Sequence, residues 1–225
     1  MRASVIGATG FAGAELLRLL DGHPQAELAY ITSESSTGED IAAMYPHLRG
    51  RIDKQLISMN ELEKIAKGSD VIFIALPHGH AMKIGKMLRG SGVKIIDLGG
   101  DYRFRDVKVF EKWYKVPHAD PEAKAVYGLT ELYRKDVAAA ELVANPGCYT
   151  TCSILALVPL LKAGLIETKA LLLMPSPAQQ EPGAGLNLAA CTALSTKTST
   201  LTAWQHTGIR LRLSRFILNL QAKML

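Results

Sequence analysis

The sequence predicts the α/β fold class, with a doubly wound parallel sheet. Over the first 170 residues, short runs rich in β-branched residues alternate with amphipathic stretches, which is the pattern of parallel strands joined by crossover helices. A glycine-rich turn follows the first of these runs directly. From about residue 171 the alternation stops, so we predict a Rossmann-like first domain followed by a truncated second domain.

Five runs are predicted to be strands and four stretches to be helices. The strands are 3–7, 26–32, 70–76, 93–99 and 141–145, and the helices are 11–24, 60–68, 79–90 and 148–164. The first helix has its leucines on one face and is expected to stop at Gly22 and Pro24. The last helix has an apolar side, and Pro159 is expected to kink it or end it early.

Composition and charge exclude several classes of protein. With 225 residues, 48% of them hydrophobic, the chain is large enough for a core. It has no apolar run of about 18 residues and no signal-peptide pattern at its start, so no membrane partner is expected. Three cysteines, an odd number, favour a reducing compartment. We therefore expect a cytoplasmic protein, and no metal site is predicted.

The net charge of +5 comes from the end of the chain. From residue 171 onward there are five of the 26 basic residues but one of the 21 acidic residues, which leaves 21 basic and 20 acidic residues before it. A nucleic-acid-binding surface usually spreads its basic residues over a folded face. No nucleic-acid partner is predicted.

The turn GATGFAG places Gly7, Gly10 and Gly13 between the first strand and the first helix. Glycines there allow a tight turn and the close approach of a pyrophosphate to the N–H groups of the helix. A purely structural glycine turn is the alternative. After the second strand, Thr32 and Ser33 suit the 2′-phosphate of NADP, whereas Glu34 does not.

Cys148 follows Asn-Pro-Gly at the predicted start of the last helix. The helix dipole and unpaired N–H groups there favour a thiolate. Cys152 lies one turn deeper and is expected to be a small core residue, and Cys191 is assigned no role. A thiolate beside a dinucleotide suggests that an activated acyl group forms a thioester, which hydride then reduces to an aldehyde.

Five segments together resemble the N-acetyl-γ-glutamyl-phosphate reductases of arginine biosynthesis, from residue 1 to about 170. They are GATGFAGAELLRLL, LPHG (76–79), DLGGDYRFRD (97–106), VYGLTELYR (126–134) and ANPGCYTT (144–151). The resemblance implies NADPH-dependent reduction of N-acetyl-L-glutamyl 5-phosphate to the 5-semialdehyde, with release of phosphate. It also implies a homo-oligomer in the intact family and a second domain of the semialdehyde dehydrogenase α+β type.

The resemblance also assigns site residues. Cys148 is the implied catalytic nucleophile. The predicted cofactor-binding residues are Gly7, Thr9, Gly10, Phe11, Gly13, Ser33, Pro77 and Gly79, and the predicted substrate-binding residues are Asp101, Arg103 and Glu131. The loop histidines His78 and His80 are expected to be structural. The domains are predicted as 1–147 for the dinucleotide, 148–170 for the start of the catalytic domain and 171–225 for an aberrant tail.

The tail is predicted to be translated out of frame. The family shows a His-Arg-His-Thr-Pro-Glu run that supplies a catalytic histidine, and this run is absent as written. Codons can be chosen for WQHTGIRLRLSRF so that dropping two bases yields that run, and two further tail segments agree in the same frame. We therefore expect little or no activity from this chain.

Two alternatives stay open. One is a related reductase that acts on the amino-adipate intermediate of lysine biosynthesis. The other is a non-catalytic remnant that only binds a dinucleotide.

Overall fold

The structure, a computed structural model, describes residues 1–166. These residues divide into a first compact unit, Met1–Asn145, and the beginning of a second, which starts at Pro146. The tail predicted to be out of frame, together with Cys191 and the basic residues from Lys197 on, lies outside the described residues. The predicted roles of the domains therefore stay predictions.

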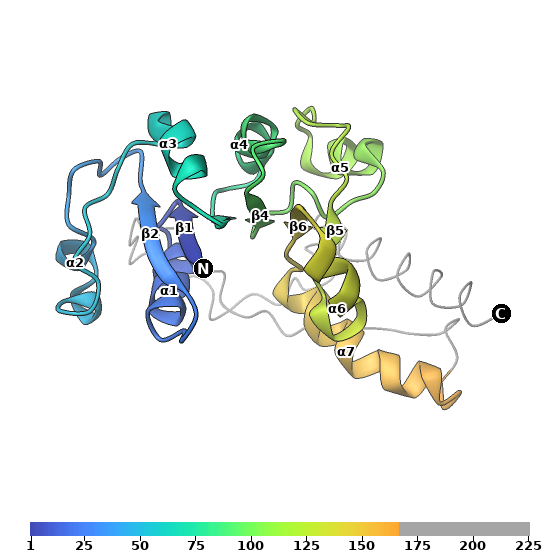
Figure 1. Cartoon of the computed structure of the whole chain (residues 1–225). Helices are drawn as coiled ribbons and strands as arrows, with labels where there is room; N and C mark the ends of the chain where they lie inside the picture. The colour runs from blue at the N-terminus through green and yellow to red at the C-terminus, as the bar shows by residue number, and fades with distance from the viewer. Residues whose placement is uncertain (167–225) are drawn as a thin grey trace, which may run out of the picture. The chain divides into compact units, whose positions relative to one another are not determined.

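The first unit is built on a six-stranded sheet in which every neighbouring pair is parallel. The strand order is β2-β1-β3-β4-β6-β5 (Figure 1). The strands are β1 (Arg2–Ile6), β2 (Glu27–Thr32), β3 (Val71–Ile74), β4 (Lys94–Asp97), β5 (Val126–Tyr127) and β6 (Leu142–Ala144). The five predicted strands are confirmed, whereas β5, with two residues, is too short for alternation to reveal it.

Six α-helices connect or cover these strands, with two short 3₁₀ turns. The elements are α1 (Phe11–Asp21), α2 (Ile41–Met44), η1 (Pro46–Leu48), η2 (Met59–Glu61), α3 (Leu62–Lys67), α4 (Ala81–Leu88), α5 (Val107–Tyr114) and α6 (Thr130–Ala139). The predictions for α1, α3 and α4 are confirmed. The helices α2, α5 and α6 were not predicted. Helix α2 has four residues, too few for helical periodicity, and α5 and α6 bury one residue and none, so neither has an apolar stripe.

Successive strand residues pack on opposite faces of the sheet, and both faces are covered. Val5 packs with Leu17 of α1, whereas the next residue, Ile6, packs with Ile65 of α3 and Met82 of α4. Figure 1 shows α1 on one side of the strands and α3 and α4 on the other. The fold is therefore doubly wound, as predicted.

The second unit begins with α7 (Cys148–Lys162). Its buried residues are Thr150, Ile154, Val158 and Leu161, which lie on one face because they are three or four positions apart. Cys152 is exposed, so its prediction as a core residue was wrong: it is about 200° around the helix from Thr150. Of the two effects predicted for Pro159, a kink or an early end of the regular helix, the early end is wrong, because the helix runs on to Lys162 with Pro159 inside it.

Candidate functional site

The three glycines of the turn after β1 have different surroundings. A Cβ on Gly7, whose φ is +84°, would lie 2.5 Å from the Ala75 carbonyl oxygen, and one on Gly13 would lie 2.3 Å from the Gly7 carbonyl oxygen. Both positions are thus closed by backbone. A Cβ on Gly10 would meet nothing closer than 3.7 Å. Gly10 is the N-cap of α1, so the helix begins at the one glycine of the three whose Cβ direction is open.

Hydroxyl groups gather beside this turn at the carboxyl end of β2. The Oγ1 of Thr9 lies 3.0 Å from the Oγ of Ser33, which in turn lies 3.4 Å from the Oγ of Ser35. Ser33 is buried and Glu34 is exposed. The structure therefore brings Thr9 and Ser33 together next to the glycines, as their common prediction requires. Phe11, at the start of α1, is 45% exposed.

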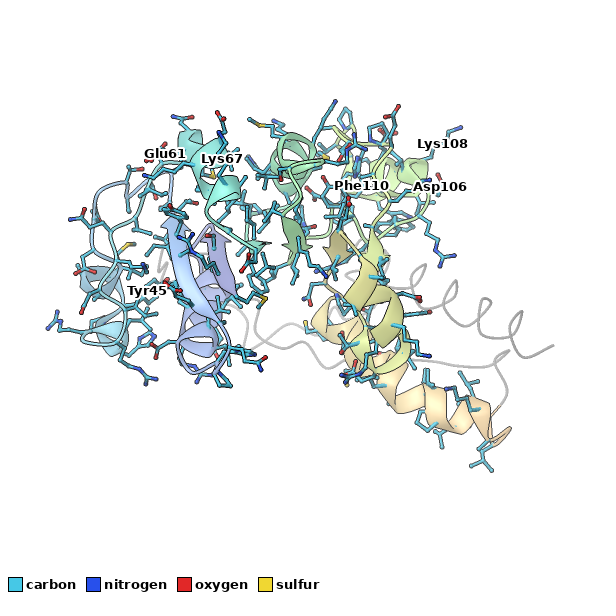
Figure 2. The ribbon with its side chains drawn as sticks, viewed as in Figure 1. Tyr45, Glu61, Lys67, Asp106, Lys108 and Phe110 are labelled. Carbon is cyan, nitrogen blue, oxygen red and sulfur yellow. The ribbon has the colours of Figure 1, made fainter. Side chains whose placement is uncertain are left out.

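Tyr45 is a residue of this site that the sequence did not reveal. Its hydroxyl donates to the Thr9 carbonyl at 2.7 Å, and in Figure 2 it lies between α2 and α1. Burial raises the pKa of Tyr45, which keeps the phenol protonated as a donor. No local motif marks it, because Tyr45 and Thr9 are 36 positions apart.

The second predicted cofactor segment follows β3. Strand β1 lies between β2 and β3, so the chain changes direction across the sheet there, and ligands of doubly wound folds bind at such a point. The loop after β3 contacts the glycine-rich turn through the close approach of Ala75 to Gly7. In this loop, Pro77 is exposed and Gly79 is buried with a φ of +87°.

Two of the three predicted substrate residues lie in the loop after β4. Asp101 is 1% exposed, and its carboxylate accepts the backbone N–H groups of Gly79 and Met82. Arg103 donates from Nε to the Asn145 carbonyl at 2.7 Å and from Nη2 to the Leu98 carbonyl at 2.8 Å.

Glu131 lies elsewhere, on the first turn of α6. It is exposed, and its carboxylate accepts a hydrogen bond from Thr130 at 3.3 Å. The contacts found among residues 1–166 do not join Glu131 to Asp101 or Arg103.

Asp97, at the end of β4, is a buried carboxyl group that sequence reasoning passed over. Its Oδ1 accepts the Gly99 N–H at 2.8 Å, and its Oδ2 has no hydrogen-bond partner within the described part of the chain. Burial raises the pKa of Asp97 to about 6; the Gly99 hydrogen bond opposes this, the charge of Asp101 adds to it and Arg103 opposes it. The sequence signal that could have identified Asp97 is an acidic residue at the end of a predicted strand, shortly before Gly99 and Gly100.

The loop histidine His78 accepts the Gly100 N–H on its Nδ1 at 3.0 Å and packs edge-on against Tyr114. This contact agrees with the structural role expected for it. His80 is exposed at the N-cap of α4.

Cys148 is the first residue of α7, and its side chain is exposed. Gly147 precedes it as the N-cap in an extended conformation. The Thr150 hydroxyl donates to the Gly147 carbonyl at 2.7 Å. This bond holds the turn that leads into the helix.

Two kinds of feature are absent from the described residues. No helix there has both the length and the apolarity to cross a bilayer. No three His, Cys, Asp or Glu side chains are grouped there as metal ligands would be.

Comparison with known proteins identifies the class. A family model described as semialdehyde dehydrogenase, NAD binding domain, matches residues 2–140. The chain therefore belongs to the semialdehyde dehydrogenase family, and its first unit contains the family's NAD-binding domain.

The curated relatives narrow this class. The N-acetyl-gamma-glutamyl-phosphate reductase of Pelotomaculum thermopropionicum is 47% identical over 190 residues, which cover 84% of this chain and 54% of the relative. The reductase of the same name from Moorella thermoacetica is 48% identical over 169 residues, which cover 74% and 49%. These matches confirm the resemblance found in the motifs. The chain spans about half the length of these relatives.

Solved structures agree on the fold. Aspartate semialdehyde dehydrogenase II from Vibrio cholerae, complexed with ASA, superimposes with a TM-score of 0.55 at 17% identity, covering 72% of this chain and 46% of that one. Aspartate semialdehyde dehydrogenase with NADP from Candida albicans gives 0.50 at 18% identity, covering 73% and 48%.

Proposed function

We propose that this chain carries the cofactor-binding and thiol-bearing part of an N-acetyl-γ-glutamyl-phosphate reductase. The reaction is reduction of N-acetyl-L-glutamyl 5-phosphate to N-acetyl-L-glutamate 5-semialdehyde, with NADPH as reductant and phosphate as leaving group. The observation that carries the proposal is the open position at Gly10, between two glycines that are closed by backbone. The names of the relatives supply the substrate.

The turn after β1 fits a dinucleotide. Space at Gly10 and the N-terminus of α1 suit a pyrophosphate, which would accept backbone N–H groups there. The hydroxyls of Thr9, Ser33 and Ser35 suit a 2′-phosphate, which favours NADP over NAD, although Glu34 follows directly. When bound, the reduced nicotinamide supplies a hydride.

Cys148 would act as the nucleophile. Its thiolate attacks the acyl carbon, a C–S bond forms, and the bond to phosphate breaks, so that phosphate leaves with the electron pair. Reduction of the thioester carbon, with a hydride that the bound cofactor would supply, would break the C–S bond, release the aldehyde and regenerate the Cys148 thiolate. Backbone N–H groups at the start of α7 can stabilise the negative oxygen that develops in each step.

Turnover by this chain is proposed to be low. The histidine run of the family is absent from the sequence as written. A group is then missing that would protonate the oxygen formed when hydride adds and take the proton back as the aldehyde is released. The first chemical step, which needs the thiol, would remain.

Rapid mixing of the purified chain with N-acetylglutamyl phosphate and NADPH tests the proposal. We expect a burst of phosphate of about one equivalent per chain, followed by slow NADPH oxidation. Cys148→Ser should abolish the burst. Cys152→Ser is the matched control, since this exposed cysteine on the same helix should leave the burst unchanged.

Other results of this experiment would contradict part of the proposal or favour a different function. A burst that survives Cys148→Ser contradicts the thiol mechanism, and rapid continued NADPH oxidation contradicts the low turnover. A larger burst with the amino-adipyl phosphate homologue would favour the lysine-pathway reductase. NADPH binding without any burst would favour the non-catalytic remnant.

A further inference from the structure

The loop between β3 and α4 is held by two contacts with the loop after β4: His78 accepts the Gly100 N–H, and the Asp101 carboxylate accepts N–H groups at the start of α4. His80, the N-cap of α4, gives no side-chain cap bond. Asp101 supplies the missing acceptor from the loop after β4: its two oxygens lie 2.9 and 3.1 Å from the Gly79 nitrogen, and Oδ2 lies 3.1 Å from the Met82 nitrogen. A buried negative charge is thus placed at the positive end of α4, where it is most favourable.

Asp101 is itself fixed on its other sides. Its carbonyl oxygen accepts the Nε2–H of His118 at 3.0 Å, and His118 Nδ1 accepts the Asp120 N–H, which places the ring hydrogen on Nε2. The next residue, Tyr102, packs on Gly85 of α4, where a Cβ would lie 2.3 Å from the Tyr102 hydroxyl. The carboxylate therefore cannot follow the loop if the loop moves.

From this geometry we propose that Asp101 is a positioning residue for the dinucleotide, rather than a ligand of the substrate. It sets the conformation of Pro77–His80, the loop that adjoins the glycine-rich turn at Ala75. Both of its oxygens are occupied by backbone donors, and its side chain is 1% exposed. The inference rests on the proposed function, because it assumes that the loop contacts the cofactor.

In a doubly wound dinucleotide site, this loop would lie on the side of the cofactor that carries the nicotinamide. The end of β2 takes the adenosine ribose in doubly wound dinucleotide sites, and β3 lies on the other side of β1. A change in the conformation of the loop should therefore weaken the binding of a complete dinucleotide and leave the affinity for an adenosine fragment unchanged.

The chain offers a matched pair of variants. Asp101→Asn keeps the size but removes the negative charge. The amide nitrogen then replaces either Oδ1, which loses the 2.9 Å bond from Gly79, or Oδ2, which loses the bond from Met82. Asp106→Asn changes the residue that caps α5, another eight-residue helix, through a 3.0 Å bond to the Lys108 N–H. Figure 2 shows Asp106 and Lys108 together on α5.

Binding to the full chain is measured by NADPH fluorescence and by calorimetry with adenosine 2′,5′-bisphosphate. Asp101→Asn should raise the Kd for NADPH about tenfold, the effect of losing one hydrogen bond to a charged group, and leave the Kd for the fragment within about twofold. Asp106→Asn should change neither Kd. An unchanged NADPH affinity in Asp101→Asn overturns the proposal, and so does an equal loss for the fragment, which would indicate general destabilisation.

Failure of the proposed function gives a different result. If the unaltered chain binds neither ligand, cofactor binding is wrong, and amide hydrogen exchange still tests the role of Asp101. Faster exchange at Gly79 and Met82 in Asp101→Asn, but not in Asp106→Asn, supports its hold on the loop. Unchanged exchange at both amides would show that Asp101 does not hold the loop, and this result overturns the proposal.

Discussion

Individual residues of the glycine-rich turn differ in what they tolerate. At Gly7 and Gly13 a backbone oxygen lies within 2.5 Å of the place that a Cβ would occupy, whereas Gly10 faces open space. Packing thus requires two of the glycines, and the third is available to a ligand. This separates the structural and the cofactor-binding explanations of one motif.

Alanine at two of these positions tests the distinction. Gly13→Ala is expected to lower the free energy of unfolding by roughly 2 kcal/mol or more, because its Cβ would overlap the Gly7 carbonyl. Gly10→Ala should lower it by less, about 1 kcal/mol, because alanine is a weaker N-cap than glycine, and it should weaken NADPH binding. Urea unfolding followed by circular dichroism, with an NADPH titration, measures both. Equal destabilisation by the two variants would contradict this assignment.

Asp97 predicts a pH dependence of stability. Its pKa is raised to about 6 in the folded protein and is about 3.9 when unfolded. Between these values the folded state binds the extra proton, so stability falls as the pH rises from about 4 to about 6. Relative to the original chain, Asp97→Asn should gain up to about 3 kcal/mol across this window, since each tenfold change in proton affinity corresponds to about 1.4 kcal/mol. The unfolding free energies of the two chains are compared by urea denaturation at about pH 4 and about pH 6. A difference between the chains that is the same at these two pH values would refute the raised pKa of Asp97.

At the scale of elements, α5 shows how a short helix is held by one side chain. Phe110 is its only buried residue; it stacks on Tyr114 with ring centroids 4.7 Å apart and meets His118 edge-on at 5.1 Å. Figure 2 shows Phe110 on the side of α5 toward α4.

The exposed ion pairs near and on α3 have a smaller effect. Lys64–Glu61 and Lys67–Glu63 are screened by solvent, so they contribute little to the stability of that helix.

Removal of the Phe110 side chain should destabilise α5. Phe110→Ala is expected to cost about 3 kcal/mol or more of unfolding free energy, because a buried aromatic ring leaves a cavity. Phe110→Leu should cost less. Lys108→Ala, on the exposed side of the helix, is the control and should change little. Chemical denaturation gives all three values, and an Ala variant as stable as the control would show that α5 does not depend on Phe110.

For the whole molecule, cofactor binding should appear as stability. A ligand that binds only the folded chain adds about 2.7 kcal/mol at one hundred times its Kd. We expect NADPH to raise the unfolding temperature more than NADH does at equal concentration, because of the hydroxyls at Thr9 and Ser33. Scanning calorimetry compares the two. A larger shift with NADH would indicate that Glu34 decides the preference.

The tail is a separate prediction about the whole chain. Sequencing the DNA across codons 165 to 180 is expected to show one base gained or lost relative to close relatives. An unbroken reading frame there would disprove it.

Local sequence patterns predict most strands of the sheet and only part of the helices that cover it. Five strands, α1, α3, α4 and the start of α7 follow from alternation, helical periodicity and turn residues. The helices α5 and α6 were missed because so little of them is buried. Cys152 was misplaced because the sequence does not show which side of a largely apolar helix becomes buried.

The candidate site divides in the same way. The glycines and Cys148 were recognisable because each depends on its immediate neighbours in the chain. Tyr45 and Asp97 were missed, and the contacts of Asp101 were unforeseen, because they join residues 22 or 36 positions apart or depend on burial.

By itself, the sequence determined the parallel α/β fold, the family and the position of the cysteine, since turns, periodicity and motifs are properties of neighbouring residues. Only the tertiary structure decided that Gly10 is open while Gly7 and Gly13 are closed, and that Asp101 holds the loop after β3. Burial and long-range hydrogen bonds exist only once the strands are side by side, and they decide which polar groups are already paired and which can meet a ligand.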